Sequence, residues 1–284
     1  GGRDYHRCLG KRVTRLRDSL VRAGMPRGSL KGGTDAVPVR ERALAVQAGI
    51  GFLAKSAMTI SPDRGPYLLL GELLTTADLP VDDPARGTCG TCTACLDACP
   101  TGAIVAPFEV DARKCLSYST IELRGSIPHD LRAAQGDRLF GCDDCLEVCP
   151  FTKHSGGLKT PAAQREPDLQ VHRALARYAL QDVLAMDQIA WDEDWTGTAV
   201  RRATLSGLRR NAAVVLGNLK DEAAQDPLRK CLEDPDGVVR GHAAWALGRI
   251  DPNDPELRNR WEKEADPAVR HELERAMAGA AQAD

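Results

Sequence analysis

The sequence predicts three successive regions: a mixed α/β segment over residues 1–80, a metal-binding insert over 81–155 and an all-α repeat domain over 169–284. Three observations support this prediction. Helical and strand patterns alternate in the first region, eight of the ten cysteines lie in the insert, and a helical pattern repeats in the last third. Only 4% of the residues are aromatic, while Ala, Arg and Leu are common, which is typical of a helix-rich chain.

The first region contains the patterns of two helices and two strands. Apolar residues recur at helical spacing over 5–23, and a shorter helix is expected over 41–48, just before Gly49. Strands are expected over 58–60 and 67–74, because turn-forming residues separate these two apolar runs.

The cysteines of the insert form two short runs that each end in Cys-Pro. The first run is Cys89, Cys92, Cys95 and Cys99, and the second is Cys142, Cys145 and Cys149, with Cys115 upstream. This spacing is typical of the ferredoxin signature for cubane iron–sulfur clusters, in which the last cysteine of each run ligates the other cluster. The predicted ligands of the first [4Fe–4S] cluster are Cys89, Cys92, Cys95 and Cys149. Those of the second are Cys99, Cys115, Cys142 and Cys145.

Two other uses of these cysteines fit the sequence less well. Structural zinc sites usually separate two Cys-x-x-Cys pairs by a longer spacer, whereas here a third cysteine follows at once. Disulfide frameworks belong to short secreted chains, and the sequence has no export signal. Cys8 and Cys231 lie outside the pattern and are interpreted as ordinary small side chains.

The last region repeats itself with a period of 31 residues. Helices are predicted over 208–219, 237–250 and 268–278, and the run that starts at Arg209 matches the run that starts at Arg240. Asp-Pro dipeptides separate the helices. Short helical pairs with Ala at close contacts are typical of HEAT-like repeats, which either form an extended binding surface or cap a neighbouring domain.

The net charge and the composition of the sequence limit the classes of partner. The formal net charge of 284 residues is −2, so a nucleic-acid partner must bind a local basic patch. No run approaches the ~20 apolar residues of a membrane helix. Metal-binding cysteines without an export signal predict a cytoplasmic protein, which we expect to be a monomer. Because the sequence does not start with Met, we expect it to be incomplete at its N-terminus.

Several motifs together resemble the epoxyqueuosine reductase family. The resemblance rests on residues 2–6 (GRDYH), 35–39 with 41–43 (DAVPV and ERA), 48–55 (AGIGFLAK), 70–72 (LGE), 99–104 (CPTGAI), 117–122 (SYSTIE) and 141–145 (GCDDC), and on the repeats that follow. It implies an α/β cobalamin-binding domain, here partial, that contains a ferredoxin-like insert for two [4Fe–4S] clusters and precedes HEAT-like repeats.

The resemblance also implies an activity and its residues. Electrons from an external low-potential donor such as ferredoxin or flavodoxin would pass through the clusters to cobalamin, and the epoxide of epoxyqueuosine in the tRNA anticodon stem-loop would be reduced. Asp35 matches the family's acid, and burial against the corrin would raise its pKa toward that task. His6 and Arg42 match other pocket positions, and Lys55 and Tyr118 are further candidates for cofactor contacts.

Each of these residues also has an ordinary structural interpretation. Asp35 would more commonly cap a turn, and Arg42 would more commonly form a surface ion pair. Arginines at 201, 202, 209 and 210 form a cluster that could bind tRNA phosphates: Arg201, Arg202, Arg209 and Arg210. A solvated helix face has the same composition.

Two other functions share these features. A reductive dehalogenase also combines cobalamin with two clusters, but it usually carries an export signal and lacks HEAT repeats. A ferredoxin-like electron carrier fused to a helical solenoid would have no use for the motifs around Asp35 and Lys55.

Overall fold

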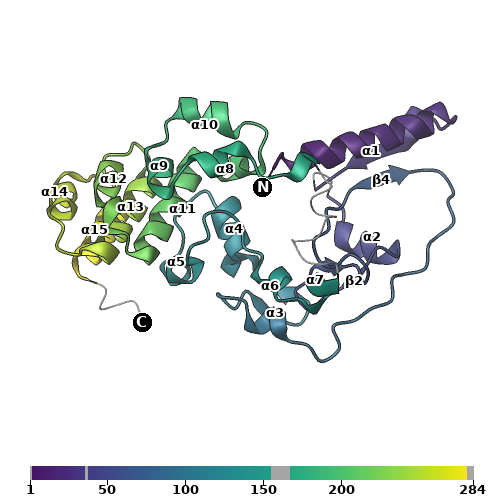
Figure 1. Cartoon of the computed structure of the whole chain (residues 1–284), viewed down its shortest axis with the longest axis horizontal. Helices are drawn as coiled ribbons and strands as arrows, with labels where there is room; N and C mark the ends of the chain where they lie inside the picture. Colours follow the sequence, from purple (N-terminus) through teal and green to yellow (C-terminus); the bar gives the residue numbers. More distant parts are fainter. Residues whose placement is uncertain (1, 36–37, 155–166, 280–284) are drawn as a thin grey trace. The chain divides into compact units, whose positions relative to one another are not determined.

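The computed structural model describes residues 2–35, 38–154 and 167–279 (Figure 1). The predicted linker near 155–168 therefore lies almost entirely outside the described residues. The chain divides into two compact units, which we call the cysteine unit (1–111 and 143–171) and the helical unit (112–142 and 172–284). Residues 112–142 thus pack with the repeats, although the sequence-based boundaries grouped them with the insert, and those boundaries stay a prediction.

The cysteine unit is built from short elements. Its α-helices are α1 (Tyr5–Arg22), α2 (Glu41–Gln47), α3 (Ala94–Asp97), α6 (Asp144–Glu147) and α7 (Pro150–His154). Its strands are β1 (Leu30–Gly33), β2 (Phe52–Leu53), β3 (Thr59–Ile60), β4 (Glu72–Thr75), β5 (Ile104–Ala106) and β6 (Glu109–Val110). The strands form three two-stranded antiparallel sheets, β1 with β4, β2 with β3 and β5 with β6.

The helices expected over 5–23 and 41–48 are confirmed as α1 and α2, and the strand expected over 58–60 is confirmed as β3. The strand expected over 67–74 is mostly wrong, because only its last three residues belong to β4. The four residues of β1 pair with residues 72–75, from Gly33 opposite Glu72 to Leu30 opposite Thr75. Residues 67–71 therefore have no partner strand among the described residues. A strand needs that partner for its backbone hydrogen bonds.

The helical unit begins with two helices before the repeats, α4 (Leu116–Ile121) and α5 (His129–Gln135). The others are α8 (Arg173–Arg177), α9 (Leu180–Ala185), α10 (Gln188–Trp195), α11 (Thr204–Leu219), α12 (Gln225–Cys231), α13 (Gly237–Ile250), α14 (Pro255–Lys263) and α15 (Pro267–Met277). Short 3₁₀ turns precede α4, α11 and α12. The three predicted repeat helices are confirmed as α11, α13 and α15.

Close contacts between the repeat helices explain their small residues. A Cβ atom on Gly217 would lie 2.9 Å from the Cα of Ala246, and one on Gly248 would lie 2.7 Å from the Cα of Ala276. These glycines are 31 residues apart, so each repeat uses the same position to bring the next helix close. The Asp-Pro dipeptides at 254 and 266 begin α14 and α15, where each aspartate caps the helix and each proline occupies the first turn.

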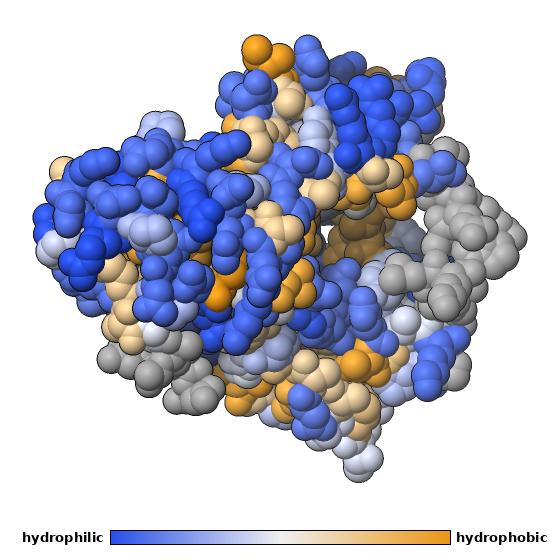
Figure 2. Space-filling model, turned by 60° about the vertical axis from the view of Figure 1, so that its left-hand side comes forward, coloured by the Kyte–Doolittle hydropathy of each residue, from blue (hydrophilic) through white to orange (hydrophobic). Residues whose placement is uncertain are grey.

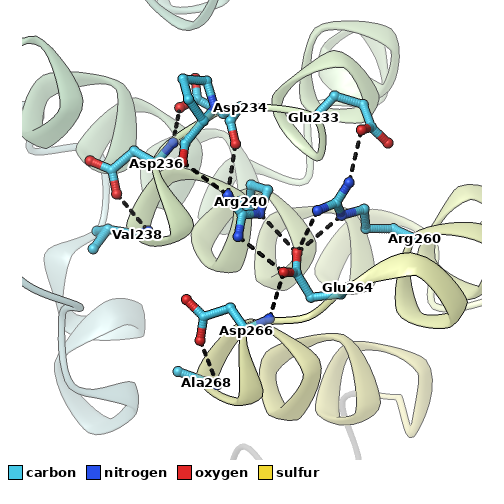
Figure 3. A network of polar contacts seen from close by, with 10 residues as sticks. Glu233, Asp234, Asp236, Val238, Arg240, Arg260, Glu264, Asp266 and Ala268 are labelled. Carbon is cyan, nitrogen blue, oxygen red and sulfur yellow. Dashed lines mark hydrogen bonds and ion pairs between the residues drawn. The ribbon is translucent and has the colours of Figure 1, made fainter.

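A buried polar network joins the loops between α13, α14 and α15 (Figure 3). Glu264 is the central acceptor, and it pairs with Arg240 at 2.8 Å and with Arg260 at 2.8 Å. Burial alone would raise the pKa of Glu264, but hydrogen bonds from Arg240, the backbone of Asp266 and Arg260 lower it to about 2. The network therefore holds a carboxylate that is charged at neutral pH inside the repeat stack.

The face of the helical unit in Figure 2 is covered mostly by hydrophilic residues, with apolar residues only scattered among them. Most of its buried apolar side chains form one cluster that includes Trp195, Leu216 and Leu247, and a smaller cluster contains Ile127, Leu131 and Val214. No helix in the described part of the chain is long and apolar enough to cross a membrane.

Candidate iron–sulfur and cofactor site

Five cysteines of the cysteine unit line one small cavity. The cavity has a volume of about 170 Å³, and its sulfur-bearing residues are Cys89, Cys92, Cys95, Cys145 and Cys149. Ala54, Ile60 and Phe151 supply apolar parts of its wall. The ring of Phe151 packs edge-on against the ring of Phe52, with 5.2 Å between their centroids, so aromatic side chains extend the apolar wall. The cavity therefore fits a cluster held by thiolates in apolar surroundings.

Burial and the thiols of the first predicted ligand set raise the pKa values of Cys95 and Cys149. Burial raises the pKa of Cys95, and the nearby groups of Cys89, Cys92 and Cys149 raise it further. Burial also raises the pKa of Cys149, to which Cys89 and Cys92 add. These four residues are the predicted ligands of the first cluster. Their mutual repulsion is what bound iron would relieve, because metal binding favours the thiolate form.

Lys55 lies against the loop that carries the first cysteines. Its ammonium donates to the carbonyls of Gly90 at 2.9 Å and Cys92 at 2.8 Å, and its backbone N–H donates to the sulfur of Cys89 at 3.4 Å. The side chain thus holds the cluster loop in place, and the backbone amide adds a hydrogen bond to a predicted ligand. Such bonds to sulfur are one means by which proteins adjust cluster potentials.

The predicted ligands of the second cluster divide between the two units. Cys99 and Cys145 belong to the cysteine unit, and Cys115 and Cys142 belong to the helical unit. Burial would raise the pKa of Cys99, but backbone N–H groups of Ile104, Thr101 and Ala103 outweigh it and lower the pKa. Amide hydrogen bonds of this kind stabilise a thiolate. The assignment of this ligand set stays a prediction.

A larger cavity of about 800 Å³ lies elsewhere in the cysteine unit. Its lining residues are Asp35, Val39, Arg40, Glu41, Arg42, Ala43, Val46, Gln47, Leu53, Ala57 and Phe108. The volume is within the range of cofactor pockets, and apolar side chains with a few charged groups are the usual lining of such sites. The structure therefore places Asp35 and Arg42 in the lining of one cavity, and their roles there stay a prediction.

Asp35 is the centre of a hydrogen-bond network. Its Oδ2 accepts a hydrogen bond from the Tyr5 hydroxyl at 2.7 Å and lies 3.3 Å from His6 Nε2. The other ring nitrogen of His6, Nδ1, lies 2.7 Å from Asp4 Oδ1. The side chain of Asp35 is 47% exposed, so the burial that the sequence analysis expected would have to come from a bound cofactor.

The sequence did not indicate two further carboxylates near Asp35, those of Glu41 and Glu72. Glu41 Oε1 accepts the backbone N–H of Asp35 at 2.6 Å, and Glu72 on β4 lies beside Glu41. Burial raises the pKa of Glu72, and Glu41 and Asp35 raise it further. Both oxygens of Glu72 are buried without a donor among the described residues. Burial and the like charges of Glu41 and Asp35 therefore both favour the protonated form of Glu72.

The turn between β2 and β3 separates the two cavities. Leu53 and Ala57 line the large cavity, whereas Ala54 and Ser56 line the cysteine cavity. The turn is closed by a hydrogen bond from Ala57 N to Ala54 O at 2.8 Å. We call residues 53–57 the dividing turn. Residues of this one turn line both the sulfur-lined cavity and the cavity that contains Asp35.

Three residues around the large cavity have strained backbones. Asp35, Ala57 and Phe108 have φ values of 52°, 60° and 72°, in the left-handed region that non-glycine residues rarely adopt. Arg42 Nη1 donates to the carbonyl of Ala57, and Phe108 N donates to the carbonyl of Lys55 at 2.9 Å. Such strain is common at functional sites, where surrounding contacts hold residues in unusual conformations.

The remaining predicted site residues belong to the helical unit. Tyr118 lies on α4, three residues after Cys115, and its side chain is partly exposed. Arg201 pairs with Asp192 at 2.5 Å and lies over the Trp191 ring, and Arg202 pairs with Glu122 at 2.7 Å. Both arginines keep part of their surface accessible.

The other two arginines have structural roles. Arg210 is 1% exposed, and its guanidinium donates to the carbonyls of Ser119, Leu123 and Gly125, so its predicted phosphate contact is wrong. Arg209 is mostly buried and pairs with Asp234 at 2.6 Å. The equivalent Arg240 of the next repeat pairs with Glu264 in the same manner. This repetition in the sequence was the available signal that Arg209 belongs to the repeat core.

These features define an iron–sulfur protein that carries HEAT repeats. The family described as a 4Fe-4S double cluster binding domain matches residues 88–152, and the HEAT repeat family matches residues 194–278. The chain is 39% identical to epoxyqueuosine reductase from Shewanella oneidensis over 92% of this chain and 66% of that protein. It is also 39% identical to the enzyme from Xanthomonas campestris, over 87% of this chain and 68% of that protein.

A solved structure agrees with this similarity. A crystal structure of epoxyqueuosine reductase with a tRNA-Tyr epoxyqueuosine-modified stem loop superimposes with a TM-score of 0.88 at 34% identity, covering 98% of this chain and 72% of that one. The chain belongs to the epoxyqueuosine reductase family. It spans about two thirds of the length of the curated relatives named above.

Proposed function

We propose that this protein reduces epoxyqueuosine to queuosine at the wobble position of tRNA. The observation that carries this proposal is the dividing turn, which separates a cysteine-lined cavity from a cofactor-sized cavity with a carboxyl group. The reaction adds two electrons and two protons to the epoxide, forms the alkene and releases the oxygen as water. Family membership favours this activity over a dehalogenase or a simple electron carrier.

The large cavity is the proposed site of cobalamin. Leu53, Ala57 and Phe108 would contact its apolar surface, and Arg42 supplies a cation at the edge. When bound there, cobalamin would supply a strongly reducing cobalt centre. The dividing turn would keep this cofactor close to the first cluster while Ala54 and Ile60 exclude water from the cysteine cavity.

Asp35 is the proposed proton donor. His6 Nδ1 is held by Asp4, so its Nε2 faces Asp35 and would return a proton to that carboxyl group after each turnover. The Tyr5 hydroxyl fixes the same carboxylate oxygen, and Glu41 fixes the Asp35 backbone. The chain thus positions the acid from both sides, and its burial by cofactor and substrate would raise its pKa into a useful range.

The proposed partners follow from the same chemistry. The tRNA anticodon stem-loop would approach the large cavity, and Arg201 and Arg202 are the proposed phosphate contacts on the helical unit. An external donor such as ferredoxin or flavodoxin would reduce the clusters. We propose a monomer that works in the cytoplasm, where its thiols stay reduced.

The test is an Asp35→Asn variant of the full-length protein, reconstituted anaerobically with iron, sulfide and cobalamin. We expect turnover of an epoxyqueuosine stem-loop to fall by about 10²–10⁴-fold, the usual range for loss of a general acid, with unchanged iron content. Asp18→Asn is the control, because Asp18 lies on α1 and pairs with its neighbour Arg17. Full turnover by the Asp35 variant would remove this residue from the mechanism.

A further inference from the structure

The repeat surface of the helical unit is occupied by a segment of the same chain. This segment, residues 116–142, begins after Cys115 and ends at Cys142, and we call it the ligand segment. Arg210 and Asn211 of α11, His242 of α13 and Glu272 of α15 all bind it. Asn211 and His242 occupy the same position of successive repeats, 31 residues apart, so one face of these repeats holds the segment.

Asn211 connects the two ends of the ligand segment. Its buried amide nitrogen donates to the carbonyl of Thr120 at 2.7 Å and to the carbonyl of Leu139 at 3.0 Å. Arg210 lies beside it and binds Asn211 Oδ1 at 2.8 Å. A single side chain therefore fixes a point five residues after Cys115 against a point three residues before Cys142.

Two further hydrogen bonds extend this connection to the cysteines. The hydroxyl of Thr120, which is fully buried, accepts the backbone N–H of Gly141 at 2.9 Å. Ser117 Oγ accepts the N–H of Cys142 and donates to its carbonyl, both at 3.1 Å. Since Cys115 directly precedes α4, side-chain hydrogen bonds from Ser117, Thr120 and Asn211 to the backbone fix the segment after Cys115 against the segment that ends at Cys142.

We infer that Asn211 and Thr120 are positioning residues for the second iron–sulfur cluster, so that the first HEAT repeat is part of the scaffold of that cluster. The inference rests on the proposed ligand set, because Cys115 and Cys142 are two of its four members. It gives the repeats a role in electron transfer that is separate from contact with tRNA. Arg210 supports this role by donating hydrogen bonds to the carbonyls of Ser119, Leu123 and Gly125 beside Asn211.

The experiment compares Asn211→Ala with Asn218→Ala in the reconstituted full chain. Asn218 is a matched control, since it lies on the same helix and also donates to two carbonyls of the ligand segment, those of Arg132 and Gly136. These acceptors lie at least six residues from either cysteine. We expect the Asn211 variant to lose about half of the roughly eight irons of two clusters, or to show a changed EPR signal and midpoint potential for one cluster only.

Thr120→Val is a second test in case the Asn211 variant fails to fold. It removes the hydroxyl group and preserves the shape of the side chain. We expect it to alter the same cluster, and Asn218→Ala to keep full iron and the wild-type spectrum. Wild-type spectra in both the Asn211 and Thr120 variants would overturn the inference, as would equal iron loss in the Asn218 variant. Wild-type protein that binds only one cluster would instead overturn the proposed ligand set, and this inference with it.

Discussion

The two units of the protein reach stability by different means. In the helical unit, a large cluster of buried apolar residues extends from Ala174 to Ala276, and Ile127, Leu131 and Val214 form a smaller one. In the cysteine unit, the buried cluster beside the metal site contains Phe52, Ala54 and Ile60, and Cys89 and Cys149 complete its packing. Because ligand sulfurs take the place of core side chains, we conclude that bound iron supplies much of the folding free energy of the cysteine unit.

Removal of iron is expected to give the largest effect that distinguishes the units. In the apo-protein, backbone amides of the cysteine unit should exchange at least about 100-fold faster than in the reconstituted protein, whereas those of α11 and α13 should change little. Hydrogen exchange measured by mass spectrometry checks this difference. Equal protection of both units without iron would contradict the comparison.

Substitution of Glu264 tests the stability of the helical unit. We expect Glu264→Gln to lower the free energy of unfolding by about 3–5 kcal/mol, because it leaves the buried Arg240 without its charge partner. Glu233→Gln is the control from the same network. Its side chain is 68% exposed and it also pairs with Arg260, so its loss should cost at most about 1 kcal/mol. Thermal denaturation of the two variants measures both values.

The same carboxylate predicts a pH dependence. The pKa of Glu264 is lowered to about 2 from 4.5, so its contribution is present above pH 4.5 and is lost as the pH falls from 4.5 toward 2. Between pH 4.5 and 2, the free energy of unfolding of the helical unit should therefore fall less steeply in the Glu264→Gln variant than in the wild-type protein. Superimposable acid transitions would show that the Glu264 network contributes nothing.

Much of the fold could be predicted because its signals are local. The spacing of apolar residues predicted α1, and the 31-residue period predicted α11, α13 and α15. The strand expected over 67–74 failed because its length is set by β1, a Leu-Lys-Gly-Gly run with no alternating pattern. Pairing with a distant strand is not visible in the pattern of one segment.

The candidate site was predictable in its residues and not in its arrangement. The spacing of the cysteines indicated the clusters, and the motifs indicated Asp35 and Arg42. The support of Asp35 by Glu41 and the position of the dividing turn depend on contacts between segments, which the sequence does not encode locally. Arg210 was misinterpreted since a buried arginine and a solvated one look alike in a basic run.

The smallest expected effects concern tRNA binding by the helical unit. Arg201→Ala and Arg202→Ala should each weaken binding of a tRNA stem-loop and reduce the slope of log K against log salt by about 0.7–0.9. Arg258→Ala, at an exposed position on α14, is the charge-matched control and should leave the slope unchanged. Identical slopes for all three variants would remove Arg201 and Arg202 from the proposed interface.

Transfer of electrons across the dividing turn is tested most directly by rapid-mixing spectroscopy of the full-length protein under anaerobic conditions. With pre-reduced clusters and bound cobalamin, addition of an epoxyqueuosine stem-loop should reoxidise the clusters and yield one queuosine for every two electrons lost. Without cobalamin, the clusters should stay reduced and no product should form. Equal cluster reoxidation and product formation in the absence of cobalamin would contradict the account.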